Sequence, residues 1–355
     1  MRRTNFLLLL ILQVIILMYG CNTKKQNNMK LSDKNWLRVS GDQIVNQKGD
    51  TVYLRGFGLG GMLHMENFID GYPANEEAMR EGLLKVLGEK NYHLFFDTFL
   101  KSYFTEPDAE YIHSLGLNLV RIPINYHLFE DDMNPRVIKE GAFEYLDKVI
   151  ELCAKNKIYT IIDLHALPGS QNQHWHSDNP TNKAMFWQHK DFQDRAIILW
   201  EAIAQRYKDQ PWVAGYDLIN EPAEPTGEKL FPYYKRLRDA ILKIDPNHIL
   251  FLEGDRYAVD FDKFTEIWDN VVYTNHDYAV PGFIFGGDYP GKTVIDILTR
   301  IPLNMISLRK VNLCFQTMFL SGWVNSDRFI LVTQKKMKCV TGYLKINWHI
   351  TTNTR

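Results

Sequence analysis

The stretch GYDLINEPAE, residues 215–224, decides how this chain is interpreted. An apolar run typical of a buried strand ends at Asn220 and Glu221, and a proline follows directly. Taken alone, this ending is equally typical of the residues that cap a helix N-terminus. Its meaning therefore depends on whether other strands of the chain end in the same way.

On both sides of this stretch, short β-branched runs alternate with longer helical patterns. Three segments place apolar residues three or four positions apart, as amphipathic helices do, around Leu146, Leu199 and Leu237. Strands this apolar are buried on both faces, so the alternation predicts an α/β fold with a parallel sheet covered by helices. Six strands are predicted: Val52–Gly58, Leu119–Pro123, Tyr159–Leu164, Gly215–Ile219, Ile249–Glu253 and Val271–Thr274.

Polar residues gather where four of these strands end. Singly, each residue is more often structural than functional, as an ion-pair donor or a buried imidazole that is hydrogen bonded. Parallel strands deliver their ends to one rim, where the loops of a barrel build an active site. The sequence therefore predicts one shared site from these strand ends: Arg121, His165, Asn220 with Glu221, and His276 with Tyr278.

The motifs LVRIP, DLHALPGSQN, LINEP and NHDY resemble those of glycoside hydrolase family 5, the cellulase family, in the same order. RGFGLGG and the loop LPGSQNQHWHSDN are similar to its exo-β-1,3-glucanase and glucosidase branches. The resemblance covers roughly residues 36–292 and implies a (β/α)8 TIM barrel. It also implies a glycosidase that retains anomeric configuration and acts on β-glucan or cellulose-type chains or oligosaccharides, without a cofactor.

The resemblance implies a role for each strand-end residue. Glu221 is the expected acid/base, whose proton its surroundings must hold near the working pH. Asn220 is expected to bind the sugar 2-hydroxyl, and Arg121 to orient an ionised nucleophile. The residues expected to line the sugar subsite next to the cleaved bond are His165, His276 and Tyr278.

The loop after the third strand is rich in aromatic side chains that could stack on sugar rings. The substrate-binding candidates there are His174, Trp175, His176 and Trp187, although core packing is an equally reasonable interpretation for Trp187. The histidines also admit a metal-dependent hydrolase. His165, His174, His176 and His276 show no recognisable ligand spacing, so the sequence predicts no metal.

One essential residue is missing. In the family the nucleophile is a glutamate at the end of the seventh strand, and this chain has no glutamate after Glu266. Met318–Asp327 can be encoded by a set of permitted codons that reads VPVWVGEFG in a shifted frame, which would restore such a strand and its glutamate. We therefore expect out-of-frame translation over residues 293–355, a barrel incomplete after about the sixth strand, and an inactive chain.

The same tail is strongly basic. Residues 297–355 carry nine Lys and Arg against one acid, Asp327, whereas the whole chain has a net charge of −1. The cations follow no helical face or known motif, which argues against a nucleic-acid or membrane module. A second interpretation of the whole protein is a non-catalytic relic that keeps its sugar-binding residues.

The N-terminus has the layout of an export signal. Residues 1–21 place two arginines before an apolar run that ends at Gly20 and Cys21, and a polar linker follows over residues 22–35. The ending resembles a bacterial lipoprotein processing site, which would attach lipid at Cys21; plain secretion and an uncleaved anchor remain open. The expected location is the cell envelope or the exterior.

Overall fold

The computed structural model describes residues 36–276 and 313–316. Its centre is a seven-stranded, all-parallel sheet in the order β3-β4-β5-β6-β7-β8-β9. Among the described residues β3 and β9 form its two edges, so the sheet is an open part of a barrel. The strands are β3 Gly56–Gly58, β4 Leu119–Asn125, β5 Tyr159–Ala166, β6 Val213–Asp217, β7 Ile249–Glu253, β8 Val271–His276 and β9 Leu313–Gln316.

All six predicted strands are present, with ends that shift by a few residues; the largest change is β3, which begins at Gly56 instead of Val52. The sheet is an incomplete barrel, as expected, and the described residues add one strand to the six that were predicted. β9 lies inside the basic tail and pairs in parallel with β8, from Tyr273 with Leu313 to His276 with Gln316. An unpaired strand edge offers a row of free N–H and C=O groups, which the short run LCFQ satisfies.

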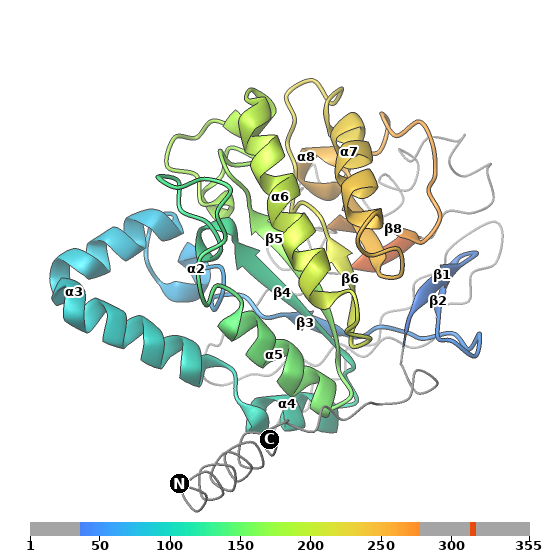
Figure 1. The fold of residues 1–355 in the computed structure, drawn as a ribbon, viewed down its shortest axis with the longest axis horizontal. Helices are drawn as coiled ribbons and strands as arrows, with labels where there is room; N and C mark the ends of the chain where they lie inside the picture. The colour runs from blue at the N-terminus through green and yellow to red at the C-terminus, as the bar shows by residue number, and fades with distance from the viewer. Residues whose placement is uncertain (1–35, 277–312, 317–355) are drawn as a thin grey trace, which may run out of the picture.

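Helices cover the outer face of the sheet, with α5, α6 and α7 side by side in Figure 1. The amphipathic predictions correspond to α5, α6 and α7. The helices are α2 Asn67–Asp70, α3 Glu76–Tyr103, α4 Glu106–Ser114, α5 Glu144–Lys155, α6 Lys190–Tyr207, α7 Leu230–Leu242 and α8 Asp255–Ala258, with 3-10 turns η2 Tyr126–Leu128, η3 Trp175–Ser177 and η4 Met185–Trp187. Among the described residues no helix is both long enough and apolar enough to span a membrane.

The sequence analysis did not predict the long helix α3. In both views it forms an arm that extends away from the sheet. It bends at Gly88, where φ is +71°, a conformation that glycine adopts without a steric penalty. Few of its residues are buried, so its sequence lacks the apolar stripe by which α5 was predicted.

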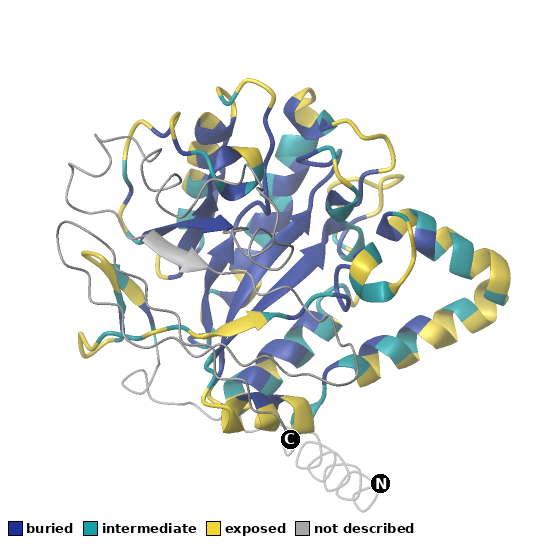
Figure 2. Cartoon of the chain, turned by 180° about the vertical axis from the view of Figure 1, so that it is seen from behind, coloured by how far each residue is buried: buried dark blue, intermediate teal, exposed yellow. Residues whose placement is uncertain are grey.

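Side chains point alternately to the two faces of the sheet, and Figure 2 shows β4 to β8 as a buried layer. One set of side chains packs against the helices, for example Ile162 and Leu250. The other set lines the inner face, where the strand starts are apolar, as at Ile161 and Phe251. A two-stranded hairpin, β1 Arg38–Ser40 with β2 Gln43–Val45, packs on this inner apolar cluster.

The inner face changes from apolar to charged toward the carboxyl ends of the strands. Residues two positions apart share a face, so Asp163 and His165 follow Ile161, and Glu253 follows Phe251. Parallel register then sets these ends beside one another, with Asp163 opposite Asp217 on β6. The fold thus collects polar side chains at one rim of an otherwise apolar sheet.

Candidate active site

Arg121 lies at the centre of this rim. It is 1% exposed and projects from β4. Its guanidinium pairs with three buried carboxylates: Asp163 Oδ2 at 3.0 Å, Asp217 Oδ2 at 2.8 Å and Glu253 Oε1 at 3.0 Å. We call these three residues the carboxylate cluster. The planar fork of arginine, with five donors, can serve several acceptors at once.

Arg121 alone cannot neutralise three buried anions, so a second cation or bound protons must supply part of the balance. Burial raises the pKa of Asp163 to about 6, despite the opposing attraction of Arg121. Burial and the nearby Glu253 raise the pKa of Asp217 well above its usual value. The cluster is therefore partly protonated near neutral pH, and Arg121 stays charged within it.

His165 and Asn220 meet beside Arg121. Arg121 Nη2 donates to Asn220 Oδ1 over 3.0 Å, which fixes the orientation of that amide. Asn220 Nδ2 then faces His165 Nε2 at 3.2 Å, and His165 Nδ1 lies 2.7 Å from Asp163 Oδ2. His165 Nε2 thus accepts and its Nδ1–H donates. Burial, followed by the charge of Arg121, lowers its pKa and keeps this ring neutral.

Glu221 follows β6 and is 6% exposed. An imidazole contacts each of its carboxylate oxygens: His276 Nδ1 is 2.6 Å from Oε1, and His176 Nε2 is 2.9 Å from Oε2. Its main chain has φ +46°, in the left-handed region that non-glycine residues seldom adopt. Strained backbone of this kind concentrates at functional sites.

The pKa of Glu221 departs from the expectation of a proton held near the working pH. Burial raises it, but hydrogen bonds from His176 and His276 outweigh burial and bring it well below the usual value. Glu221 is therefore ionised at neutral pH in this arrangement. A second carboxylate close to Glu221 would push its pKa upward, against the two imidazoles that hold it down.

The loop candidates divide into two groups. His176 contacts Glu221, and its ring stacks on the exposed His174 at 5.7 Å between centroids. Trp175 is partly exposed and packs edge to face with Phe68 at 5.6 Å. His176 thus lies beside Glu221, and His174 and Trp175 contact His176 in turn; a role of these three residues in substrate binding stays a prediction.

Trp187 does not lie in the site. It is 2% exposed and packs in the main core against Phe186 and Tyr233. Its indole N–H donates to the carbonyl oxygen of Gln171 over 2.8 Å, so its one polar group is also satisfied. The substrate-binding prediction for Trp187 is therefore wrong, because its faces are covered by protein. Of the other predictions, Tyr278, the residues 1–35 and the tail apart from β9 lie outside the described residues.

Sequence reasoning missed several residues of the rim. The carboxylate cluster is one set, although Asp163 sits two residues before His165, on the same strand face. Glu66 is another: it is 8% exposed, its Oε1 lies 3.8 Å from His165 Nε2, and burial raises its pKa to about 7. Beside it, both ring nitrogens of the buried His64 lack hydrogen-bond partners.

His64, Glu66 and His165 place one ligand atom each within 4.8 Å of one another, as a metal site could. This set differs from the four histidines considered from the sequence. The Nε2 atom of His165 already faces Asn220, which leaves that nitrogen engaged. The chemistry of the rim therefore depends on its carboxylates and imidazoles.

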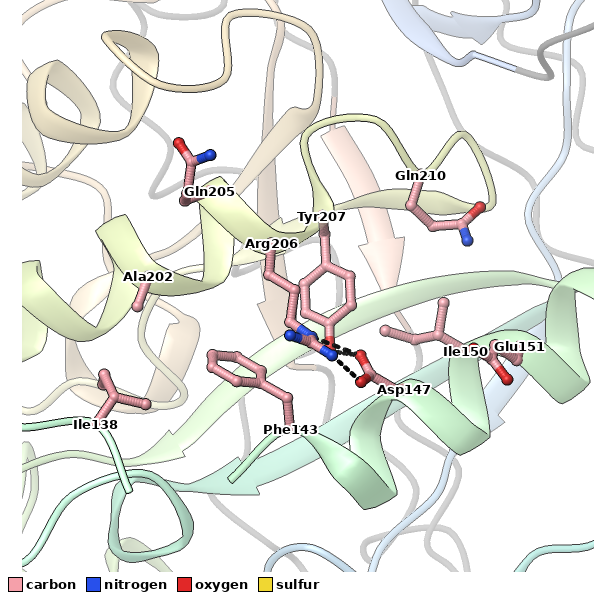
Figure 3. A pocket seen from close by; sticks show the side chains of 10 residues that line it. All are labelled: Ile138, Phe143, Asp147, Ile150, Glu151, Ala202, Gln205, Arg206, Tyr207 and Gln210. Atoms are coloured by element: carbon pink, nitrogen blue, oxygen red, sulfur yellow. Dashed lines mark hydrogen bonds and ion pairs between the residues drawn. The ribbon is translucent and has the colours of Figure 1, made fainter. Parts of the chain in front are cut away.

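A groove of about 630 Å³ lies elsewhere, between α5 and α6. Figure 3 shows Arg206 and Tyr207 turned toward Asp147, with hydrogen bonds that join the two helices. Its lining comes from outer helices and includes none of the strand-end residues. This hollow is a surface feature of helix packing, separate from the rim.

The glycosyl hydrolase family 5 model, described as cellulase, matches residues 87–293, more than half of the chain. A β-xylosidase from Phanerodontia chrysosporium is 52% identical over 251 residues, which cover 70% of this chain and 53% of that protein. A probable glucan 1,3-β-glucosidase A from Emericella nidulans is 33% identical, covering 64% and 57%. The chain thus spans about half the length of the curated relatives that it matches.

Solved structures agree with the fold. An endogalactoceramidase structure gives a TM-score of 0.55 at 16% identity, with 78% of this chain and 66% of that one covered. A rutinosidase from Aspergillus niger gives 0.54 at 16% identity, with 74% and 89% covered. At such identities the likeness shows the barrel fold alone. The family match, which contains Arg121, His165, Asn220 and Glu221, shows more: this chain belongs to glycosyl hydrolase family 5, the cellulase family.

Proposed function

We propose that this protein is a retaining β-glycosidase in which Glu221 is the acid/base. The observation that carries the proposal is the contact of an imidazole with each carboxylate oxygen of Glu221, at 2.6 and 2.9 Å. Asn220, held by Arg121, lies next to it and is suited to bind a sugar hydroxyl. An ionised Glu221 suits the base half of the reaction, in which it takes a proton from water.

The acid half requires a second carboxylate. Retaining glycosidases place two carboxyl groups about 5–5.5 Å apart. A carboxylate at that distance would raise the pKa of Glu221 and let it donate a proton to the leaving group. We infer that the missing nucleophile belongs to the displaced frame after about residue 293, which the end of the family match at residue 293 supports. The chain as written is then impaired.

The substrate that we propose is a β-linked glucan or its oligosaccharides, with β-xylosides as close alternatives. The relatives bear the names β-xylosidase and glucan 1,3-β-glucosidase. Xylose has the ring hydroxyls of glucose without its hydroxymethyl group, so one hydroxyl-binding site can serve both. Trp175 and His176 supply a partly exposed ring edge beside Glu221 for such a sugar.

An anion supplied from solution tests the proposal on the chain as it is. With azide and an aryl β-glucoside or β-xyloside, azide attacks the anomeric carbon from the open face while the aryl–oxygen leaving group departs. Glu221 gives that leaving group its proton and recovers one from water. The expected product is the α-glycosyl azide, formed faster as the pH falls toward the pKa of Glu221.

The matched control is Glu221→Gln, which keeps the size of the side chain and removes the proton donor. We expect the azide-dependent rate to fall by about 10²-fold or more, while oligosaccharide binding measured by calorimetry persists. Sugar binding without an azide reaction in the unchanged chain, and without hydrolysis in a chain with the frame restored, would favour the non-catalytic relic. Equal rates for Glu221→Gln and the unchanged chain would refute the acid/base role.

We also propose that the protein is exported and anchored by lipid at Cys21, on the strength of the N-terminal pattern alone. The test is expression in a bacterial host supplied with labelled fatty acid. The label is expected in the membrane fraction of the unchanged chain and not in Cys21→Ser. Label-free protein in the medium would favour plain secretion.

A further inference from the structure

Glu253 contacts several residues of this site, although the sequence analysis assigned it no role. It ends β7, and its side chain is fully buried. Arg121 Nη2 donates to its Oε1 over 3.0 Å, and the backbone N–H of Glu221 donates to its Oε2 over 2.6 Å. His276 Nε2 lies 3.1 Å from Oε1. One carboxylate thus contacts a cation, an imidazole and the main chain of the proposed acid/base.

The hydrogen bond from the backbone N–H of Glu221 to Glu253 helps to hold a strained main-chain conformation of Glu221. Glu221 has φ +46°, and a residue with a Cβ adopts this conformation only when its surroundings hold it there. A hydrogen bond from its N–H to a buried carboxylate is charge-assisted and therefore among the stronger ones in proteins. Glu253 is thus well placed to keep Glu221 in the conformation that directs its carboxylate toward His276 and His176.

The contact with His276 acts on the side chain of Glu221. The His276 ring lies between two glutamates, with Nδ1 2.6 Å from Glu221 Oε1 and Nε2 3.1 Å from Glu253 Oε1. The Nδ1 contact is a hydrogen bond and the Nε2 contact an ion pair, so the ring serves both carboxylates when both nitrogens carry a proton. Burial lowers the pKa of His276, but Glu253 and Glu221 outweigh it and raise the pKa to about 10. The charge of His276 also acts on Asp163, whose pKa it lowers, and Arg121 binds the same Glu253 oxygen.

We propose that Glu253 is a positioning residue for Glu221, which it holds directly through the backbone N–H and indirectly through a charged His276. The inference rests on the proposed acid/base role of Glu221. Glu253 is covered by protein and engaged by Arg121, so it acts on the sugar only through these neighbours. Its loss would free the His276 ring on one side and relax the main chain of Glu221.

The test compares two buried carboxylates on the same guanidinium. Glu253→Gln changes the carboxylate beside His276, whereas Asp217→Asn changes a carboxyl whose hydrogen bond comes from Arg121. The measurement is the ¹⁵N NMR titration of the His276 ring in the full chain, with the signal identified by its absence in His276→Asn. We expect Glu253→Gln to lower the pKa of His276 by at least about one unit, a tenfold change in its acid constant, and Asp217→Asn to leave it nearly unchanged.

A pKa unchanged by Glu253→Gln, or lowered equally by both variants, would overturn the proposal. If Glu253→Gln does not fold, Glu253→Asp decides: its shorter carboxylate keeps the charge, and a smaller but measurable drop is expected, with no drop counting against the proposal. The titration needs no turnover. If the pKa of His276 shifts as expected but the chain shows no azide reaction, only the catalytic role of Glu221 is rejected. An azide reaction slower in Glu253→Gln than in Asp217→Asn would support both the positioning role of Glu253 and the acid/base role of Glu221.

Discussion

Replacing Arg121 by Gln should destabilise the protein in a way that grows with pH. At about 3 Å and an effective dielectric constant near 20, each ion pair of Arg121 carries roughly 5 kcal/mol of gross attraction. Desolvation of the guanidinium offsets most of this, and losing one partner of a buried pair costs about 3–5 kcal/mol. Without the cation, the buried carboxyls of Asp163 and Asp217, whose pKa values burial already raises, bind protons on folding. Stability then falls as the pH rises through those raised pKa values.

The assay is urea unfolding followed by circular dichroism at pH 5 and pH 8. The loss in unfolding free energy for Arg121→Gln should be about 3–5 kcal/mol at pH 8 and smaller at pH 5. Arg206→Gln is the matched control, since Arg206 binds Asp147 bidentately on the exposed surface, where a pair is worth about 0–1 kcal/mol. A loss below about 1 kcal/mol, or one equal at both pH values, would refute the charge balance described for the cluster.

Three further outcomes follow from individual contacts. Burial lowers the pKa of His127, but Asp132 and Asp178 outweigh burial and raise the pKa to about 9. The stability that this histidine contributes is complete below about pH 6.5 and is lost as the pH rises through about 9. The urea midpoint should therefore decline over that range less steeply in His127→Asn than in the unchanged chain. Gly215→Ala would bring a Cβ to 2.0 Å from the carbonyl oxygen of Ile249, which should separate β6 from β7 and cost about 2–3 kcal/mol in thermal unfolding; an unchanged melting temperature contradicts the close approach. Trp175→Ala should weaken oligosaccharide binding several-fold, by about 1 kcal/mol in calorimetry. The core variant Trp187→Phe should leave the affinity unchanged. Weaker binding in Trp187→Phe than in Trp175→Ala would show that Trp187 does contact the sugar.

The strand ends were predictable because two local signals coincide there. A run such as TIIDLH shows both the apolar strand and the polar residue that ends it, and parallel strands must place those ends at one rim. Arg121, Asn220 and His165 do meet within hydrogen-bonding distance, as do Glu221 and His276. The prediction failed for Trp187, since a tryptophan in a loop gives no local sign of whether helices will cover it.

The sequence by itself determined the strand–helix alternation, the rim of polar residues and the family motifs, because each is written in spacing along the chain. Only the tertiary structure decided which carboxylates share Arg121 and that Glu253 joins His276 to the backbone of Glu221. Register between neighbouring strands sets these distances, and it depends on packing across the whole sheet. The ionised state of Glu221 is a tertiary property for the same reason, since two imidazoles from separate parts of the chain impose it.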